Sequence, residues 1–147
     1  FDIAIDNGLS NFLRRCCCDS LTRVSKPIVL WMIKNNKVSN YNYICDDVIT
    51  LTSRFRDDKE VMLETARNYG YTDFLKYASD KLKKDRELVL TAIESYASNL
   101  EYASDELKND KEVVLSAVKQ NGWTLRYASE ELQHDEELAI IAEKNKF

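Results

Sequence analysis

Residues 110–132 read DKEVVLSAVKQNGWTLRYASEEL, a stretch that indicates two short helices joined by a turn. Asp110 is suited to cap the first helix, because its carboxylate can accept a free backbone amide of the first turn. Asn121 and Gly122 predict the end of that helix, with the glycine supplying a left-handed conformation. Apolar residues lie between these signals at helical spacing: Val113, Val114, Ala117 and Val118.

The second half of the stretch predicts a second helix. Thr124 is a candidate cap for it, and Leu125, Ala128 and Leu132 would share one of its faces. In the preceding unit, Asn99 takes the position of a cap. Each unit is therefore expected to be a helical hairpin.

The same pattern recurs along the chain, with Asp85, Asp110 and Asp135 spaced by 25 residues and Asp58 lying 27 residues before Asp85. Self-similarity at such a period is the signature of a repeat protein. We expect regular units over the following ranges: 58–84, 85–109, 110–134 and, in part, 135–147.

Residues 1–57 repeat the pattern in a degenerate form, with a longer insertion loop near residues 37–43. Both parts are expected to form one continuous array. The chain does not begin with Met, and its two ends fall within units, so we expect it to be a segment of a longer protein.

A hairpin of about 25 residues cannot bury its apolar stripe alone, and stacking on its neighbours would do so. The predicted fold class is therefore all-α: a right-handed-type α-solenoid of short helix-turn-helix repeats, with roughly eleven helices and no strand. Close helix contacts are expected at Ala78, Ala103 and Ala128. Three core ladders are expected: Leu63, Leu90, Leu115 and Ile140; Leu75, Leu100 and Leu125; Phe55, Leu82, Leu107 and Leu132.

The regular units share an Asp-Lys-Glu or Asp-Arg-Glu start and a Tyr-Ala-Ser triplet at 77–79, 102–104 and 127–129. These motifs resemble the repeat family named domain of unknown function 4116, clearly over residues 58–147 and weakly over 1–57. The resemblance implies tandem helical repeats within longer proteins of protists, large DNA viruses and bacteria that live inside such hosts. It implies no established enzymatic activity and supplies no functional residues.

The sequence shows no catalytic apparatus, and we expect the chain not to be an enzyme. No phosphate-binding loop, dinucleotide fingerprint, zinc-protease motif or nucleophile elbow occurs, so no catalytic residue, cofactor, metal site or small-molecule substrate is expected. His134 has no repeated counterpart and is interpreted as an exposed loop residue. Cys16, Cys17, Cys18 and Cys45 are interpreted as reduced thiols, with lipidation, redox chemistry or intermolecular disulfides as alternatives.

Charge is distributed unevenly. The chain carries a net charge of −4, which argues against nonspecific nucleic-acid binding by the whole molecule. Residues 1–56 contain eight Lys or Arg and five Asp or Glu, whereas residues 57–147 contain thirteen and twenty. The basic residues of the first third that suggest a patch are Arg14, Arg15, Arg23, Lys26, Lys34 and Lys37.

The candidate partner-binding residues belong to two groups. The first consists of the three triplet tyrosines and the variable residue before each: Lys76, Tyr77, Glu101, Tyr102, Arg126 and Tyr127. The second is Trp123, which lies at the turn between helices and would either staple the turn or anchor a partner. Packing between repeats is the competing interpretation of the tyrosines.

Three functions remain open. The leading hypothesis is a noncatalytic protein-binding or scaffolding segment of a larger protein, whose partner is another protein. The alternatives are a targeting or regulatory region of a larger enzyme or secreted effector, and nucleic-acid binding through the basic first third. We expect a cytoplasmic location, including host cytosol if the protein is secreted, and dimers through unpaired terminal helices are a further possibility. No apolar run is long enough to span a membrane.

Overall fold

The computed structural model describes residues 25–34, 54–69 and 73–146 of the chain, and these are all-helical with no strand. None of the helices in these ranges is long and apolar enough to cross a membrane. The four cysteines, the expected loop near 37–43 and most of the degenerate part lie outside the described residues. The count of about eleven helices included those residues, so it stays a prediction.

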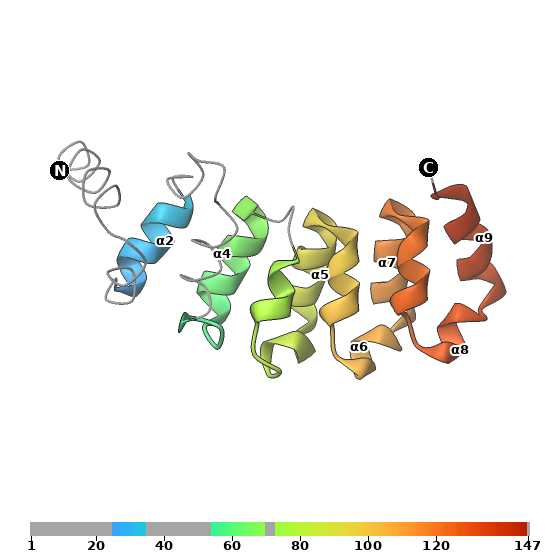
Figure 1. The fold of residues 1–147 in the computed structure, drawn as a ribbon, viewed down its shortest axis with the longest axis horizontal. Helices are drawn as coiled ribbons and strands as arrows, with labels where there is room; N and C mark the ends of the chain where they lie inside the picture. The colour runs from blue at the N-terminus through green and yellow to red at the C-terminus, as the bar shows by residue number, and fades with distance from the viewer. Residues whose placement is uncertain (1–24, 35–53, 70–72, 147) are drawn as a thin grey trace.

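The first helix of each unit forms a row with its counterparts. Figure 1 shows these helices side by side in chain order, and each contacts the next along the chain. An inner helix of this row is therefore covered on both sides by other first helices. The helices of this row are α2 (Lys26–Lys34), α4 (Lys59–Tyr69), α5 (Arg86–Ser95), α7 (Lys111–Gln120) and α9 (Glu136–Lys144).

A second row consists of short 3-10 helices, in which η2 contacts η4 and η4 contacts η5. A further short helix follows each of them and leads back to the first row. The 3-10 helices are η2 (Phe74–Tyr77), η4 (Ala97–Tyr102) and η5 (Gly122–Tyr127). The helices that follow are η3 (Leu82–Lys84), α6 (Asp105–Lys108) and α8 (Glu130–Gln133).

The expected continuous second helix is wrong, because the Tyr-Ala-Ser triplet interrupts it. Ala128 is extended, with φ −69° and ψ 168°, and α8 begins only at Glu130. The cause is a bond to the neighbouring unit: the Ser129 amide donates to the Lys108 carbonyl at 2.9 Å instead of to its own helix. Equivalent bonds tie the other triplets to their preceding units: Ser104 N to Lys83 O and Ser79 N to Arg56 O, both at 3.0 Å.

The predicted aspartate caps are confirmed. Asp110 accepts the amides of Glu112 and Val113 at 3.0 and 3.3 Å. Its three counterparts make the same kind of bond: Asp58 with the Val61 amide, Asp85 with Leu88 and Asp135 with Leu138.

Two other predicted caps are wrong. Thr124 is fully buried inside η5, where its hydroxyl donates to the Asn121 carbonyl at 2.7 Å. Asn121 is the cap of that helix, since its side chain accepts the Trp123 amide. Asn99 is also fully buried, and its side chain accepts the Leu75 amide at 3.2 Å across the second row.

The core is built around the stripe predicted from residues 110–132. All four of its members, Val113, Val114, Ala117 and Val118, are fully buried, and so are their equivalents in α5: Leu88, Val89, Ala92 and Ile93. Full burial of one side chain of Val or Leu size stabilises the fold by roughly 1.5–3 kcal/mol. The three triplet alanines are buried as expected.

The predicted ladder of Leu63, Leu90, Leu115 and Ile140 is confirmed only in part. Its three leucines are half-buried and pack against the core, whereas Ile140 is 58% exposed. Ile140 lies on α9, the last helix in the described ranges. The other two ladders are buried except for Phe55 and Leu125, which are half-buried.

Gly122 is the first residue of η5, and a glycine is needed there for a reason other than the predicted left-handed conformation. A Cβ built at this position would lie 1.9 Å from the carbonyl oxygen of Ala142, and the Gly122 amide donates to Asn145 O at 2.8 Å. The glycine is needed because the backbone of α9 approaches this closely.

We therefore expect Gly122→Ala to force α9 away from η5 and to lower the free energy of unfolding by about 1–3 kcal/mol, the usual cost of overpacking. Urea unfolding followed by circular dichroism would measure this change. Ala97→Gly, at the equivalent position of the preceding unit, is the matched control and should cost less than about 1 kcal/mol. Equal stability of Gly122→Ala and the wild type would contradict the close approach.

Candidate functional site

The predicted contact residues of the triplets come together along the second row. Tyr77, Tyr102 and Tyr127, hereafter the tyrosine row, end η2, η4 and η5, which contact one another in sequence. All three rings are half-buried, and those of Tyr102 and Tyr127 pack against the core. Both interpretations of the tyrosines are compatible with this placement, since a half-buried ring can pack against its neighbours and still reach the surface.

Tyr102, the central member of the tyrosine row, has a hydroxyl affected both by burial and by nearby carboxylates. Burial raises the pKa of Tyr102, and the carboxylates of Asp73 and Glu101 add to this effect, followed by the neighbouring tyrosines. The Tyr102 hydroxyl is therefore neutral and able to donate a hydrogen bond over the whole physiological pH range.

The residues that precede the tyrosines are exposed and alternate in charge: Lys76, Glu101 and Arg126. Lys76 lies over its own tyrosine, with its Nζ 6.0 Å from the centre of the Tyr77 ring. Arg126 lies closer, with its guanidinium carbon 4.7 Å from the Tyr127 ring and its Nη2 2.5 Å from the Tyr127 hydroxyl. Each cation is thus held beside a ring, which fixes its position on the surface.

Trp123 lies apart from the tyrosine row, at the other end of η5 from Tyr127. Its side chain is 57% exposed, and its Nε1 donates to the Lys146 carbonyl at 3.2 Å. The Lys146 ammonium lies 5.1 Å from the ring centre. The indole therefore ties η5 to the residues after α9, while most of its surface stays accessible.

A second arrangement was missed by the analysis of the sequence. The first residue of α2, α4, α5 and α7 is a cation that reaches the following helix of the row and contacts both its capping aspartate and the glutamate two residues later. We call this set of four cations the cation ladder: Lys26, Lys59, Arg86 and Lys111.

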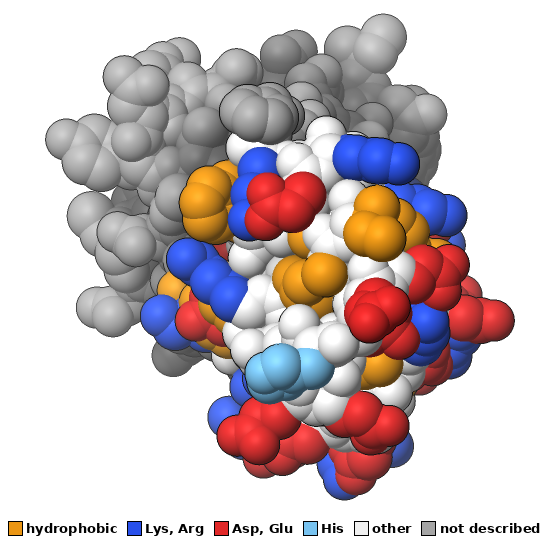
Figure 2. All heavy atoms as spheres, turned by 90° about the vertical axis from the view of Figure 1, so that its right-hand side faces the viewer, with side chains coloured by type: hydrophobic (Ala, Val, Ile, Leu, Met, Phe, Trp, Pro, Cys, Tyr) orange, Lys and Arg blue, Asp and Glu red, His pale blue; other side chains and the backbone are white. Residues whose placement is uncertain are grey.

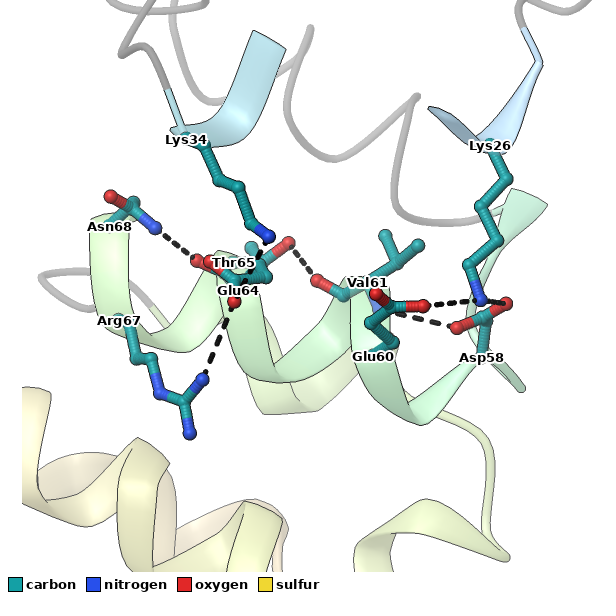
Figure 3. Close-up of polar contacts among 9 residues, drawn as sticks. All are labelled: Lys26, Lys34, Asp58, Glu60, Val61, Glu64, Thr65, Arg67 and Asn68. Atoms are coloured by element: carbon teal, nitrogen blue, oxygen red, sulfur yellow. Dashed lines mark hydrogen bonds and ion pairs between the residues drawn. The ribbon is translucent and has the colours of Figure 1, made fainter. Parts of the chain in front are cut away.

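The geometry of the ladder is nearly constant. Figure 3 shows its first rung, where the Lys26 Nζ lies 2.7 Å from Asp58 and 2.9 Å from Glu60. The Lys111 Nζ lies 2.8 Å from both Asp135 and Glu137. In the middle rungs the closest contacts are Lys59 to Asp85 at 2.8 Å and to Glu87 at 2.7 Å, and Arg86 to Asp110 at 3.1 Å and to Glu112 at 2.5 Å.

The sequence did carry a signal for the ladder. A basic residue directly follows the cap of four first helices, at positions 26, 59, 86 and 111. The cations could be assigned only once the helices were known to lie side by side.

The ladder shifts the ionisation of its members. Burial by itself would raise the pKa of Asp85, but the Lys59 ammonium and the Leu88 amide outweigh it, and the pKa of Asp85 is lowered. The same balance lowers the pKa of Asp110, with Arg86 as the cation. The pKa of Lys59 is raised in turn by its hydrogen bonds to Asp85 and Glu87.

A separate pair between units behaves similarly. The Lys84 ammonium lies 3.1 Å from the Glu106 carboxylate and lowers the pKa of Glu106 to about 2. Both side chains are largely exposed, so the pair is open to screening by salt.

The proposed basic patch of the first third is only partly described. Lys26 belongs to the cation ladder, and the Lys34 Nζ lies 3.8 Å from Glu64, as Figure 3 shows. These two cations are therefore engaged by acidic residues of the next helix. The remaining four members, Arg14, Arg15, Arg23 and Lys37, lie outside the described residues.

Ser79, Ser129 and His134 make local hydrogen-bonding contacts. The Ser79 and Ser129 hydroxyls accept the Leu82 and Leu132 amides at 3.4 Å, and the Ser129 hydroxyl donates to Asn109 Oδ1 at 2.5 Å. His134 is exposed, with its Nδ1 2.7 Å from the Glu130 carbonyl oxygen. In the described ranges, no three His, Cys, Asp or Glu side chains are grouped so that they could hold a metal ion.

Asp110 caps α7 and also carries the negative charge that Arg86 contacts, and substitutions can separate these two roles. Asp110→Ala removes both the cap and the charge, and we expect it to lower the free energy of unfolding at pH 7 by about 1–2 kcal/mol. Asp110→Asn keeps an oxygen for the Val113 amide and should cost less. Because the pKa of Asp110 is lowered on folding, its charge stabilises the fold above about pH 4, and this stabilisation is lost as pH falls through the lowered pKa.

Urea unfolding at pH 7 and pH 3 should therefore show a smaller loss of stability on acidification for Asp110→Asn than for the wild type. Asp105→Asn, at an exposed position of α6 outside the cation ladder, is the matched control and should keep the wild-type pH dependence. Identical pH dependence of all three proteins would rule out a contribution of the ladder.

Comparison with known proteins agrees with the repeat pattern. The family model described as Domain of unknown function (DUF4116) matches three overlapping segments, residues 58–108, 85–133 and 110–146. Each match begins at a capping aspartate, so the unit recognised by the family model starts where the first helix starts. No curated protein and no solved structure matches the chain. With more than half of its length matched, and the predicted resemblance confirmed over residues 58–146, this chain belongs to the DUF4116 family.

Proposed function

We propose that this chain is a noncatalytic protein-binding or scaffolding segment, built as an α-solenoid of the right-handed type. Two features support the solenoid. Contacts run mainly between neighbouring units in both rows, as expected for a fold that extends in one dimension. The units also repeat the same ties, namely the triplet serine amide and the cation ladder.

The tyrosine row with its preceding charges is the single observation that carries the binding proposal. Lys76, Glu101 and Arg126 vary in charge, whereas the tyrosine that follows each is constant. In repeat proteins a constant position serves the stack, and an exposed variable position beside it is free to read a partner. The row therefore offers a fixed aromatic base with a changeable charge pattern.

The charge pattern suggests the kind of partner. Two positive positions flank one negative position, so a partner segment with acidic groups opposite Lys76 and Arg126 would be complementary. The Tyr102 hydroxyl, which stays protonated, can donate to a carbonyl of the same segment. Because half-buried tyrosines lose little freedom on binding, they are suited to this task.

The test is affinity capture from the native cell with Lys76→Glu/Arg126→Glu, followed by mass spectrometry. Reversal of both cations should abolish recovery of the partner, since like charges would face its acidic groups. The thermal melt should stay within a few degrees of the wild type, because both substitutions are at exposed positions.

Lys81→Glu/Lys119→Glu changes the net charge equally at exposed positions outside the tyrosine row and is the matched control. It should recover the partner as the wild type does. Unchanged recovery with the Lys76 and Arg126 substitutions would remove the tyrosine row as the binding surface.

A further inference from the structure

The charged residues of the tyrosine row are not neutralised by neighbouring side chains. Among the described residues, Lys76, Glu101 and Arg126 take part in no ion pair, whereas every member of the cation ladder contacts two carboxylates. Lys76 and Arg126 are held instead beside the rings of Tyr77 and Tyr127. The three charges of the row are therefore available to a ligand that lies along it.

The tyrosine hydroxyls of the row are also available. In the part of the chain that the structure describes, the hydroxyls of Tyr77 and Tyr102 have no hydrogen-bond partner. The Tyr127 hydroxyl accepts the Arg126 Nη2 at 2.5 Å, which leaves its own hydrogen able to donate. The row thus presents O–H donors on half-buried rings and suits a ligand whose hydrogen-bond acceptors are exposed.

The spacing of the units sets the repeat of a ligand that contacts all three of them. The 3-10 helices η2, η4 and η5 contact one another in sequence, and the closest Cα atoms of neighbours lie within 8 Å. Helices packed side by side have axes about 8–10 Å apart, so the charges of the row recur at steps of about 9 Å. A complementary ligand must present acidic, basic and acidic side chains on one face at the same steps.

Polyproline II is the backbone conformation that meets this requirement. It has three residues per turn and a rise of about 3.1 Å per residue, so every third side chain lies on one face at steps of about 9.3 Å. In a β-strand, by contrast, every third side chain points to the opposite face.

The backbone acceptors distinguish polyproline II from an α-helix. A helix can place side chains seven residues apart on nearly the same face, at steps of about 10.5 Å, but its carbonyls are bonded within the helix. Polyproline II has no internal hydrogen bonds, so its carbonyls are exposed and can accept the tyrosine hydroxyls.

We propose that the tyrosine row binds a proline-rich polyproline II segment of another protein, with three residues of the segment to each unit. Its acidic side chains lie opposite Lys76 and Arg126, and a basic side chain lies opposite Glu101. The inference rests on the proposed function, since it concerns the same surface. Aromatic surfaces suit such segments because a preformed conformation loses little entropy on binding.

The rest of the molecule offers an acidic segment little general attraction. The chain carries a net charge of −4. Figure 2 shows acidic side chains gathered below the single histidine, His134, at the edge where α8 leads into α9. Binding of a segment with two acidic residues would therefore depend on the cations of the tyrosine row and not on the overall charge.

Fluorescently labelled peptides provide the probes, and fluorescence anisotropy would measure their binding to the full chain. The matched peptide, PPEPPKPPEPP, has charges at every third position, and its charge order is the same in either chain direction. The inverted peptide, PPKPPEPPKPP, exchanges the signs, and PPEPKPEPP places the charges at every second position. An alanine-based helical peptide carries glutamate, lysine and glutamate seven residues apart.

The wild type should bind the matched peptide at least about fivefold more tightly than each of the other three, because only this peptide meets both the spacing and the signs. Reversal of all three charges, by Lys76→Glu/Glu101→Lys/Arg126→Glu, should make the inverted peptide the preferred one. Tyr102→Phe keeps the ring and removes the hydroxyl, and it should weaken the matched peptide about fivefold, as expected for one lost hydrogen bond.

The matched control reverses two cations and one carboxylate at exposed positions outside the row, by Lys81→Glu/Lys119→Glu/Glu131→Lys, and should keep the wild-type preference. Three results would overturn the proposal: no binding of the matched peptide by the wild type, the same preference after reversal of the row's charges, or equal or tighter binding of the helical or every-second-position peptide.

The capture experiment keeps this inference separate from the proposed function. If Lys76→Glu/Arg126→Glu loses the cellular partner while the wild type does not bind the matched peptide, the row is a binding surface for a partner of another conformation. In that case the proposed function stands and the polyproline II inference is wrong.

Discussion

The whole structure depends on one constraint: a helical unit of about 25 residues has more apolar surface than it can bury by itself. Val113 and Val114 become fully buried only because α5 and α9 lie on either side of α7. Stability in such a fold comes from each unit and from each contact between neighbours, so every local feature that fixes the contact matters. The repeated ties between units serve this purpose.

The capping aspartates act both within their own helix and between neighbouring helices. Each one accepts amides at the start of its own helix and also receives the cation of the preceding helix. A cap that lies in the contact between units becomes partly buried, which by itself disfavours its charge, and the neighbouring cation reverses that effect. Helix initiation and stacking are therefore coupled through a single carboxylate.

The tyrosine row runs along the stack, with Tyr102 and Tyr127 packed against the core while the charge before each tyrosine varies from unit to unit. The cation ladder follows the first row, and on α9, the last described helix, Glu136 takes the position of the cation. Membership of the DUF4116 family accounts for the units themselves and leaves the varying charges to be explained by the residues of this chain.

Local chemistry determined much of the fold. The aspartate caps and the stripe through Val113 and Val114 were predicted correctly, because capping and a period of 3.6 residues involve only neighbours in the sequence. The repeat spacing also identified the family and brought Tyr77, Tyr102 and Tyr127 onto one row.

Only the tertiary structure decided the features that depend on a residue some 20 to 30 positions away. The second helix breaks because the Ser129 amide bonds to Lys108, and Gly122 is required because α9 passes within contact distance. Lys111 looks like any surface lysine until Asp135 is placed beside it. Ile140 has the residue type and register of a core position, and its exposure follows from what does or does not pack on its helix, which no local pattern specifies.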